Sequence, residues 1–273
     1  TYTALDARRA GQPLTDKLNL SSRQASRSNV EILDSASPLL YSPGDALRLT
    51  RSYLVQVPKR GAQINEFASI RATRRAGQRL VYSVDSTLAA ATSNELRQAP
   101  DIYPEWATQY IQIPELPPRV MEFGNLLADA SDNNFDRVRA TEFFMRRFPF
   151  SGDLEPLPMD RDATDFFLFD LRRGHSTLIA STMAVLVRSM GIPARLATGY
   201  SMGTFDPVTQ RYFVNPSDAH SWVEVYFPSY GWIMFEPSGF QVPVIHGGPL
   251  TDQSSDAASS TACLLYTSPS PRD

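Results

Sequence analysis

The stretch that decides the fold lies at residues 166–200 and reads FFLFDLRRGHSTLIASTMAVLVRSMGIPARLATGY. Its centre predicts a helix that begins at Ser176 and carries apolar residues on nearly every side, which is typical of a helix buried inside a domain. Gly191 can take the left-handed conformation that ends many helices, and Pro193 prevents continuation. The sequence therefore predicts a buried helix that ends just before Gly191, followed by a strand at 194–200.

Two further strand-like segments follow this helix. They read HSWVEVYF at 220–227 and GWIMFE at 231–236, and Pro228-Ser229-Tyr230-Gly231 joins them as a hairpin turn. Strands of a hairpin run antiparallel, so the start of the first and the end of the second lie at the same end of the pair. His220 opens the first strand and Glu236 closes the second. We therefore expect His220 and Glu236 to be neighbours.

Three separated pieces of this region together resemble the core of bacterial transglutaminase-like domains. In that family an R-R-G-x-C turn carries the nucleophile, an A-H-x-W strand carries the histidine, and a G-W-x-x-x-[DE]-P strand end carries the acid. The matching positions here are Ser176, His220 and Glu236. The resemblance begins near Arg79, and residues 96–157 are similar to the segment that precedes the core in membrane-anchored members.

The resemblance implies an α+β fold of the papain-like cysteine-protease and transglutaminase type. In that fold a buried helix bearing the nucleophile packs on an antiparallel sheet that carries the histidine and the acid. The family uses a thiol because a helix N-terminus and an imidazolium lower its pKa from about 8.5. Histidine acts as general acid, the carboxylate orients it, and an acyl-enzyme is resolved by an amine or water.

Ser176 replaces the thiol that this chemistry requires, and three interpretations follow. Ser176 is the N-cap of the helix, a role that serine favours; or it is the nucleophile of a Ser-His-Glu hydrolase; or the native gene encodes cysteine. Thr177, Leu178 and Ile179 also depart from the polar and aromatic residues usual after the family's cysteine. We expect a site that keeps the layout, lacks thiol acyl transfer and acts in protein or peptide binding. The alternative is an active acyl-transfer or amide-hydrolysing enzyme, a transglutaminase or protease.

Several residues around the three site positions need an interpretation of their own. By position, we expect Gly174, His175 and Trp222 to line the substrate site, with Gly174 leaving room for helix amides to form an oxyanion hole. His175 and His246 are otherwise interpreted as structural or exposed. Asp218 is a fallback acid that lies close to His220 along the chain.

The composition limits the classes of partner. The 273 residues are 42% hydrophobic with a net charge of −3 and no basic stripe, so nucleic acid is not an expected partner. No window reaches the roughly 18 apolar residues of a spanning helix. The resemblance implies no cofactor and no metal. It also implies an extracytoplasmic domain, periplasmic or on the cell surface, of a bacterial membrane protein whose membrane segments lie outside this sequence.

The sequence divides into five expected regions. Residues 1–28 are polar and predict a flexible lead, and residues 29–102 predict a small β-rich unit with runs at 47–58, 64–72 and 79–89. Residues 103–240 hold the transglutaminase-like domain, with helices at 120–130 and 132–147 and an extended connection at 100–118. Residues 241–262 form a linker. Residues 263–273, CLLYTSPSPRD, resemble a translated sequencing adaptor from a genomic or metagenomic library and contain the single cysteine.

Overall fold

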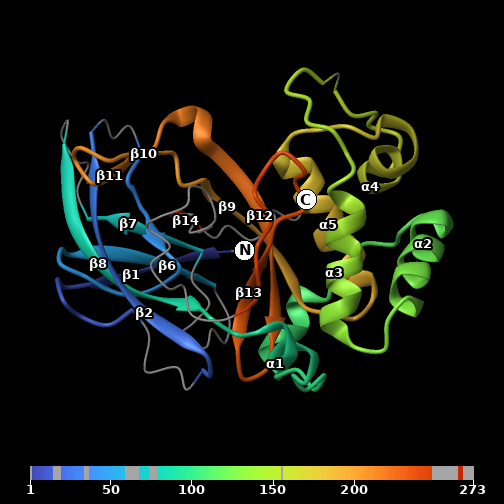
Figure 1. Cartoon of the computed structure of the whole chain (residues 1–273), viewed down its shortest axis with the longest axis horizontal. Helices are drawn as coiled ribbons and strands as arrows, with labels where there is room; N and C mark the ends of the chain where they lie inside the picture. Colours follow the sequence, from blue (N-terminus) through green and yellow to red (C-terminus); the bar gives the residue numbers. More distant parts are fainter. Residues whose placement is uncertain are drawn as a thin grey trace. The chain divides into compact units, whose positions relative to one another are not determined.

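The computed structural model describes residues 2–14, 20–33, 37–58, 68–73, 79–154, 156–247 and 264–266. They belong to two compact units (Figure 1). The first comprises Thr1–Ala90, Ala197–Ala219 and Ala262–Asp273, and the second comprises Ala91–Leu196 and His220–Thr261. The second unit carries all three site positions.

The first unit is built from antiparallel sheets. One sheet has the order β1-β6-β7-β3 and another β2-β8-β5, while β10 and β11 form a hairpin and β14 pairs with β4 and β9. The bounds are β1 Tyr2–Arg8, β2 Arg23–Ile32, β3 Leu39–Leu40, β4 Ser42–Pro43, β5 Asp45–Leu49, β6 Tyr53–Pro58, β7 Ser69–Ala72, β8 Leu80–Ala89, β9 Ala194–Tyr200, β10 Thr204–Asp206, β11 Arg211–Phe213 and β14 Leu264–Tyr266. A 3₁₀ turn spans Pro216–Asp218. The three predicted β-runs are present in β5 to β8.

The region expected to be a flexible lead contains strand β1 and the start of β2, which continues to Ile32. Strand β2 pairs along its whole length with β8. Its even-numbered side chains from Gln24 to Val30 are half-buried, whereas Ala25, Arg27 and Asn29 are exposed. This alternation is the period of a strand, but small polar side chains carry it, so composition alone concealed it.

The second unit contains the helices. They are α1 (Ser93–Arg97), a 3₁₀ helix (Glu105–Tyr110), α2 (Pro118–Asp129), α3 (Asn134–Met145), α4 (Ala163–Phe166) with a π-helical turn (Phe167–Leu171), and α5 (Ser176–Ser189). The two predicted helices at 120–130 and 132–147 correspond to α2 and α3. The 3₁₀ helix interrupts the connection expected to be extended at 100–118, because its residues contain no proline after Pro104.

Helix α5 is the centre of the second unit and has the predicted burial. Ile179, Met183, Leu186 and Val187 are completely buried, and α5 contacts both α2 and α3. Gly124 of α2 allows a close approach, since a Cβ there would lie 2.6 Å from the Ser189 hydroxyl. A mixed α/β fold with helices and antiparallel sheets is thus present, as predicted.

The C-terminus of α5 is closed by a Schellman motif. Gly191 has φ +76° and donates its N–H to Arg188 at 2.9 Å, while Ile192 donates to the Val187 carbonyl at 3.3 Å. These two bonds satisfy carbonyls at the helix end. The predicted end of the helix before Gly191 is confirmed.

The second unit holds β12, β13 and the first three residues of β9, Ala194–Leu196, in the order β13-β12-β9. Strand β12 (Ala219–Phe227) pairs antiparallel with β13 (Gly231–Phe235), with Val223 opposite Phe235 and Phe227 opposite Gly231. Ser229 and Gly231 take positive φ in the turn between them. The predicted hairpin is therefore present, with its open end at His220 and Glu236.

The unit boundaries differ from those expected from the sequence. Residues 91–102 belong to the second unit, and Ala197–Ala219 belongs to the first although it lies between two segments of the second. Of the expected linker, residues 241–247 are described and form no helix or strand, and the rest lies outside the described residues. The adaptor-like segment is described only at 264–266. Within the described residues no helix has the length and apolarity to span a membrane.

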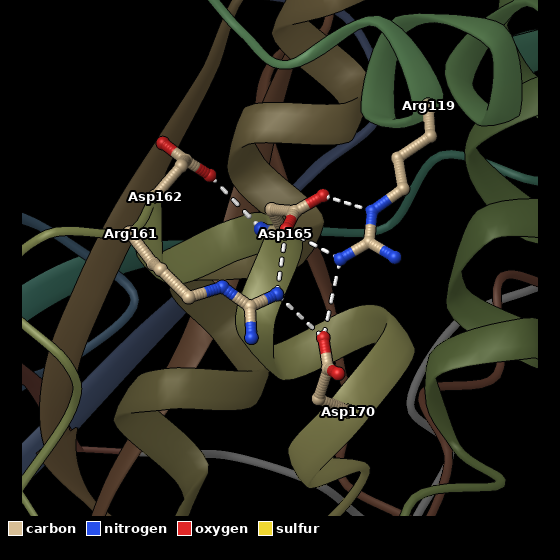
Figure 2. Close-up of polar contacts among 5 residues, drawn as sticks. All are labelled: Arg119, Arg161, Asp162, Asp165 and Asp170. Carbon is tan, nitrogen blue, oxygen red and sulfur yellow. Dashed lines mark hydrogen bonds and ion pairs between the residues drawn. The ribbon is translucent and has the colours of Figure 1, made fainter.

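An ionic cluster joins α2 to the segment that leads into α5 (Figure 2). Arg119 of α2 contacts Asp165 through both its Nε and Nη2 atoms and contacts Asp170 at 3.1 Å. Arg161 bridges the same two carboxylates at 3.0 and 2.6 Å. The hydrogen bonds from Arg119 to Asp165 and from Arg161 to Asp170 are the main causes that lower the pKa of each carboxyl. The cluster fixes α4 and the π-helical turn against α2.

Candidate functional site

Ser176 is the first residue of α5, and its position differs from the N-cap interpretation. The N-cap is His175, with φ −82° and ψ 166°, and its Nδ1 accepts the N–H of Leu178 at 3.4 Å. Ser176 is 9% exposed. Its hydroxyl is thus not committed to capping, and it lies at the positive end of the helix dipole, beside backbone N–H groups that lack intrahelical acceptors.

His220 and Glu236 form the predicted pair. The imidazole Nε2–H donates to Glu236 Oε2 at 2.6 Å, and the side chains are 2% and 1% exposed. The antiparallel register brings the two residues together, because β12 begins where β13 ends. Since Glu236 holds Nε2, the ring nitrogen left for a reacting group is Nδ1.

The first turn of α5 is attached to the strand that carries His220. The hydroxyls of Thr177 and Ser221 lie 2.9 Å apart and share a hydrogen bond. Each of these residues directly follows a site position, Ser176 or His220. Among the described residues no hydrogen bond joins the Ser176 hydroxyl to the His220 ring. The contact therefore holds the first turn of α5 against the start of β12, one residue along the chain from Ser176 and from His220, without a hydrogen bond between the serine and the histidine.

Glu236 is held by contacts that sequence reasoning missed. Its backbone N–H donates to Glu142 Oε1 at 2.8 Å, and its carbonyl accepts from Arg146 Nη1 at 2.8 Å. Its second carboxylate oxygen accepts the Ser238 N–H at 2.8 Å. Glu142 and Arg146 belong to the C-terminal half and cap of α3. No local motif in α3 marks them, since both act on a segment more than 90 residues away.

The three positions expected to line the substrate site have different surroundings. Gly174 is buried, and its N–H donates to the Pro149 carbonyl at 3.1 Å, so that amide is not available to an oxyanion. Its hydrogen atom faces Leu178 and Phe167, where a Cβ would lie at 3.1 and 3.3 Å. His175 is exposed.

Trp222 does not present a surface to a substrate in this structure, because it is completely buried. Its ring stacks beside His220, with ring centroids 6.3 Å apart and an interplanar angle of 23°. The indole N–H is buried without an acceptor among the described residues. Trp222 thus packs beside the imidazole inside the domain, and its expected role in lining a substrate site stays a prediction.

Two exposed aromatic rings lie next to the site instead. Phe240 meets His220 edge to face at 6.1 Å and packs against Phe150 at 4.8 Å. Phe150 and Phe240 are 57% and 44% exposed. Phe150 also forms a parallel β-bridge with Gly174. No hydrophobic periodicity marks Phe150 or Phe240 in the sequence, because each residue lies outside the helices and strands.

The remaining candidate residues have structural surroundings. Asp218 accepts the Asn215 N–H at 2.7 Å and caps a 3₁₀ turn. The His246 ring packs against Phe135 and Phe235, and burial lowers its pKa to about 3. Across the described residues no group of three or more His, Cys, Asp or Glu side chains is placed to hold a metal ion.

The class of site follows from these contacts. A carboxylate-held imidazole, on a strand that is bonded to the first turn of a buried helix, is an arrangement that can support acyl transfer. The imidazole can take or give a proton at Nδ1, and the helix N-terminus can stabilise negative charge on a carbonyl oxygen. The position that would attack a carbonyl carbon holds a hydroxyl.

Comparison with known proteins identifies the domain. Residues 124–237 match the sequence model of the Transglutaminase-like superfamily. These residues form a transglutaminase-like superfamily domain, and all three site positions fall within it.

Two curated relatives match this region. The chain is 40% identical over 147 residues to "Uncharacterized protein YebA" of Bacillus subtilis (strain 168), covering 50% of this chain and 20% of that protein. It is 34% identical over 162 residues to a "Protein-glutamine gamma-glutamyltransferase" of Pseudomonas aeruginosa, covering 59% of this chain and 23% of that protein. The chain therefore spans about a fifth of the length of these relatives.

A solved structure has the same fold over more of the chain. The periplasmic domain of TgpA from Pseudomonas aeruginosa superimposes with a TM-score of 0.60 and 27% sequence identity. The superposition covers 78% of this chain and 69% of that domain. The similarity thus includes part of the first unit, since 78% of the chain exceeds the whole of the second unit, Ala91–Leu196 and His220–Thr261.

Proposed function

We propose that this chain is an extracytoplasmic, transglutaminase-like domain that binds a protein or peptide through a glutamine side-chain amide and lacks thiol acyl transfer. The observation that carries the proposal is a buried, intact His220–Glu236 pair on a strand that is bonded to the first turn of α5, where Ser176 makes no hydrogen bond with the pair. An amide carbonyl is the group that such a site accommodates. The name of the Pseudomonas aeruginosa relative, a protein-glutamine gamma-glutamyltransferase, supports glutamine as the residue that carries this amide.

The serine explains why thiol chemistry is not proposed. A helix dipole that favours a thiolate leaves a hydroxyl neutral, because the hydroxyl pKa is far higher. Attack by Ser176 therefore requires proton removal by His220 during the reaction. The Ser176 hydroxyl makes no hydrogen bond with His220 in the described structure, and the proposal of binding rests chiefly on the missing thiol.

A second candidate is an active amide-processing enzyme, using Ser176 or a native cysteine at that position. The intact pair favours it, since two ionisable side chains buried to 2% and 1% exposure are costly to keep without a use. In this case Nδ1 of His220 removes the hydroxyl proton as Oγ attacks the amide carbon. The proton then passes to the departing ammonia, and water or an amine releases the acyl group.

The proposed location and partners rest on the same comparisons. The solved neighbour is described as a periplasmic domain, which supports a periplasmic or cell-surface location in a membrane protein. The partner is proposed to be a protein or peptide. Neither a metal nor a cofactor has a role in the proposed chemistry.

The test compares the wild-type chain with its Ser176→Ala and Ser176→Cys variants, all carrying Cys263→Ser. Each is mixed with a fluorescent glutamine-containing peptide and a primary amine. Binding is followed by fluorescence anisotropy, and ammonia release and the amide product by mass spectrometry. We expect wild type and Ser176→Ala to bind the peptide equally and form no product. Product formed by wild type and abolished by Ser176→Ala would establish the second candidate, and no binding by any form would reject the proposal.

The Ser176→Cys variant also shows whether the electrostatic environment at position 176 lowers the pKa of a thiol. Its single thiol is alkylated with iodoacetamide as a function of pH, with and without His220→Ala. A thiol pKa well below about 8.5 that returns to this value without His220 would show that the site still favours a thiolate. A thiol pKa near or above 8.5 would show that this part of the catalytic environment is lost.

A further inference from the structure

We propose that Glu142 and Arg146 of α3 are positioning residues that hold Glu236 against the His220 imidazole. Neither is proposed to touch a substrate, and both act on the backbone that carries the acid. The inference deepens the proposed function, because it names what sets the geometry of the same site. It adds α3 to the elements that build the site.

Glu142 fixes the N-terminal side of Glu236. Its Oε1 accepts the Glu236 N–H at 2.8 Å, and its Oε2 forms an ion pair with Arg139. The Glu142 side chain is 1% exposed, and burial raises its pKa to about 7. A carboxylate buried to this degree is unfavourable unless its contacts compensate. An apolar residue of similar size could make neither the ion pair with Arg139 nor the bond to the Glu236 backbone, and only the second of these reaches the site.

Arg146 fixes the C-terminal side of the same residue. Its guanidinium donates to the carbonyl oxygens of Glu236 at 2.8 Å, Ser238 at 3.0 Å and Gln241 at 2.7 Å. Five N–H donors in a rigid plane allow one arginine to serve several acceptors at once. Arg146 therefore fastens the segment from Glu236 to Gln241 to the end of α3.

The carboxylate has little freedom once its backbone is fixed. Glu236 Oε2 accepts from His220 at 2.6 Å, and Oε1 accepts the Ser238 N–H at 2.8 Å. The segment also packs closely on α3, since a Cβ at Gly239 would lie 2.1 Å from the Arg146 carbonyl oxygen. All four polar groups of Glu236, namely N–H, C=O and two carboxylate oxygens, have partners. A displaced backbone would therefore move the acid away from Nε2.

The test measures whether Glu236 stays in place against His220, and it requires no substrate. In isotope-labelled full-length protein, NMR follows the His220 ring N–H signal and the hydrogen-exchange rate of the Glu236 amide. The variants are Arg146→Met and Glu142→Leu. The matched controls are Arg147→Met, which replaces the exposed neighbouring arginine, and Glu142→Gln, which keeps an oxygen able to accept the Glu236 N–H. Circular dichroism confirms that each variant is folded.

We expect Glu142→Leu to speed exchange of the Glu236 amide roughly tenfold, because this N–H loses its acceptor. Arg146→Met removes the donor to the Glu236 carbonyl, so its effect is read from the His220 signal. The His220 ring N–H signal should shift or broaden in both, and both controls should keep the wild-type signals. Where either variant does not fold, Arg146→Lys takes its place, because lysine keeps the charge but not the planar fork. It should alter the His220 signal in the same way.

An unchanged His220 signal in the folded variants would overturn the inference, as would an equal change in Arg147→Met. Since no peptide or amine is present, this result does not depend on peptide binding or turnover. Failure of the proposed function would instead appear in the wild-type binding assay, with the His220 signal intact. The two failures are therefore distinguishable.

Discussion

The Thr177 and Ser221 hydroxyls lie 2.9 Å apart, so the first turn of α5 is bonded to the strand residue that follows His220. Ser221 is 3% exposed. Removal of its partner leaves a buried hydroxyl with lost hydrogen bonding. We expect Thr177→Val to lower the free energy of unfolding by about 1 kcal/mol, measured by urea denaturation. Thr177→Ser keeps the hydroxyl and is the control. An equal loss in both variants would show that the threonine methyl group, rather than the hydrogen bond, is responsible.

The buried carboxyl of Glu142 should make stability depend on pH. Its pKa is about 7 in the folded protein against 4.5 for an unperturbed glutamate, because burial outweighs the favourable charges of Arg139 and Arg146 and the nearby Glu236 also raises it. A raised carboxyl pKa means that the folded state binds the proton more tightly. Stability from this group is therefore present below pH 4.5 and is lost as pH rises through about 7.

Glu142→Gln isolates this effect, because glutamine resembles the protonated carboxyl. Relative to the variant, wild type should lose on the order of 1 kcal/mol of stability per pH unit between pH 4.5 and 7. Urea unfolding at several pH values gives the difference. Glu122→Gln, at an exposed position of α2, measures the effect of net charge alone. A wild-type minus Glu142→Gln difference that does not vary with pH would contradict the expectation.

The ionic cluster around Arg119 should make stability depend on pH in the direction opposite to that expected for Glu142 (Figure 2). The pKa of Asp165 is lowered chiefly by its hydrogen bond with Arg119. Its contribution to stability is therefore present above its unperturbed value of 3.8 and is lost as pH falls through the lower folded-state pKa. We expect Arg119→Met to unfold at a higher pH than wild type in an acid titration followed by circular dichroism.

Screening of charges by salt tests whether the ion pairs of Arg119 cause this difference. The difference between wild type and Arg119→Met should shrink in about 1 M salt, because the cluster is partly exposed. Arg173→Met removes an exposed arginine from the neighbouring turn and should leave the acid midpoint unchanged. A difference that salt does not reduce would assign the effect to the stacking of Arg119 on Phe169, which lies 4.4 Å from the guanidinium.

The parts of the fold that could be predicted are those with a local signal. Helix α5 has apolar residues on all sides and a glycine at its C-terminus, and the β12–β13 hairpin has a turn between two apolar runs. These signals placed His220 beside Glu236 by antiparallel register. Helix α1 also has a local signal in its sequence, because Thr92 and Glu95 form a capping box at its N-terminus.

The parts that could not be predicted depend on contacts between distant segments. The supports from Glu142 and Arg146 join residues 94 and 90 positions apart, and no periodicity in α3 points to them. The N-cap was assigned to Ser176 because serine is the commoner capping residue, whereas His175 caps with its ring nitrogen. Trp222 was expected at the substrate site from its position in the sequence, and only packing shows it completely buried.

Gly239 should tolerate no side chain. A Cβ there would lie 2.1 Å from the Arg146 carbonyl oxygen, a backbone atom that cannot move away freely. We expect Gly239→Ala to cost roughly 1–3 kcal/mol in unfolding free energy, as overpacked sites do. Gly247→Ala is the matched control, because a Cβ at Gly247 has no atom within 4 Å. Equal stability of the two variants in urea would show that the end of α3 moves to accommodate the added methyl group without a loss of unfolding free energy.

The exposed ring of Phe240 provides a test of peptide recognition separate from the chemistry. It lies edge-on to His220 and packs on Phe150, so a peptide whose amide reaches the site would contact it. Loss of an aromatic contact is worth about 0.5–1.5 kcal/mol. We therefore expect Phe240→Ala to raise the peptide dissociation constant roughly 2- to 10-fold in fluorescence anisotropy. Phe143→Ala removes a ring that is 66% exposed on α3, and it should leave binding unchanged. Equal affinity of both variants would place the bound peptide away from Phe240. Weaker binding with an unaltered His220 ring signal would assign the loss to the peptide contact, because the histidine–glutamate pair would then be intact.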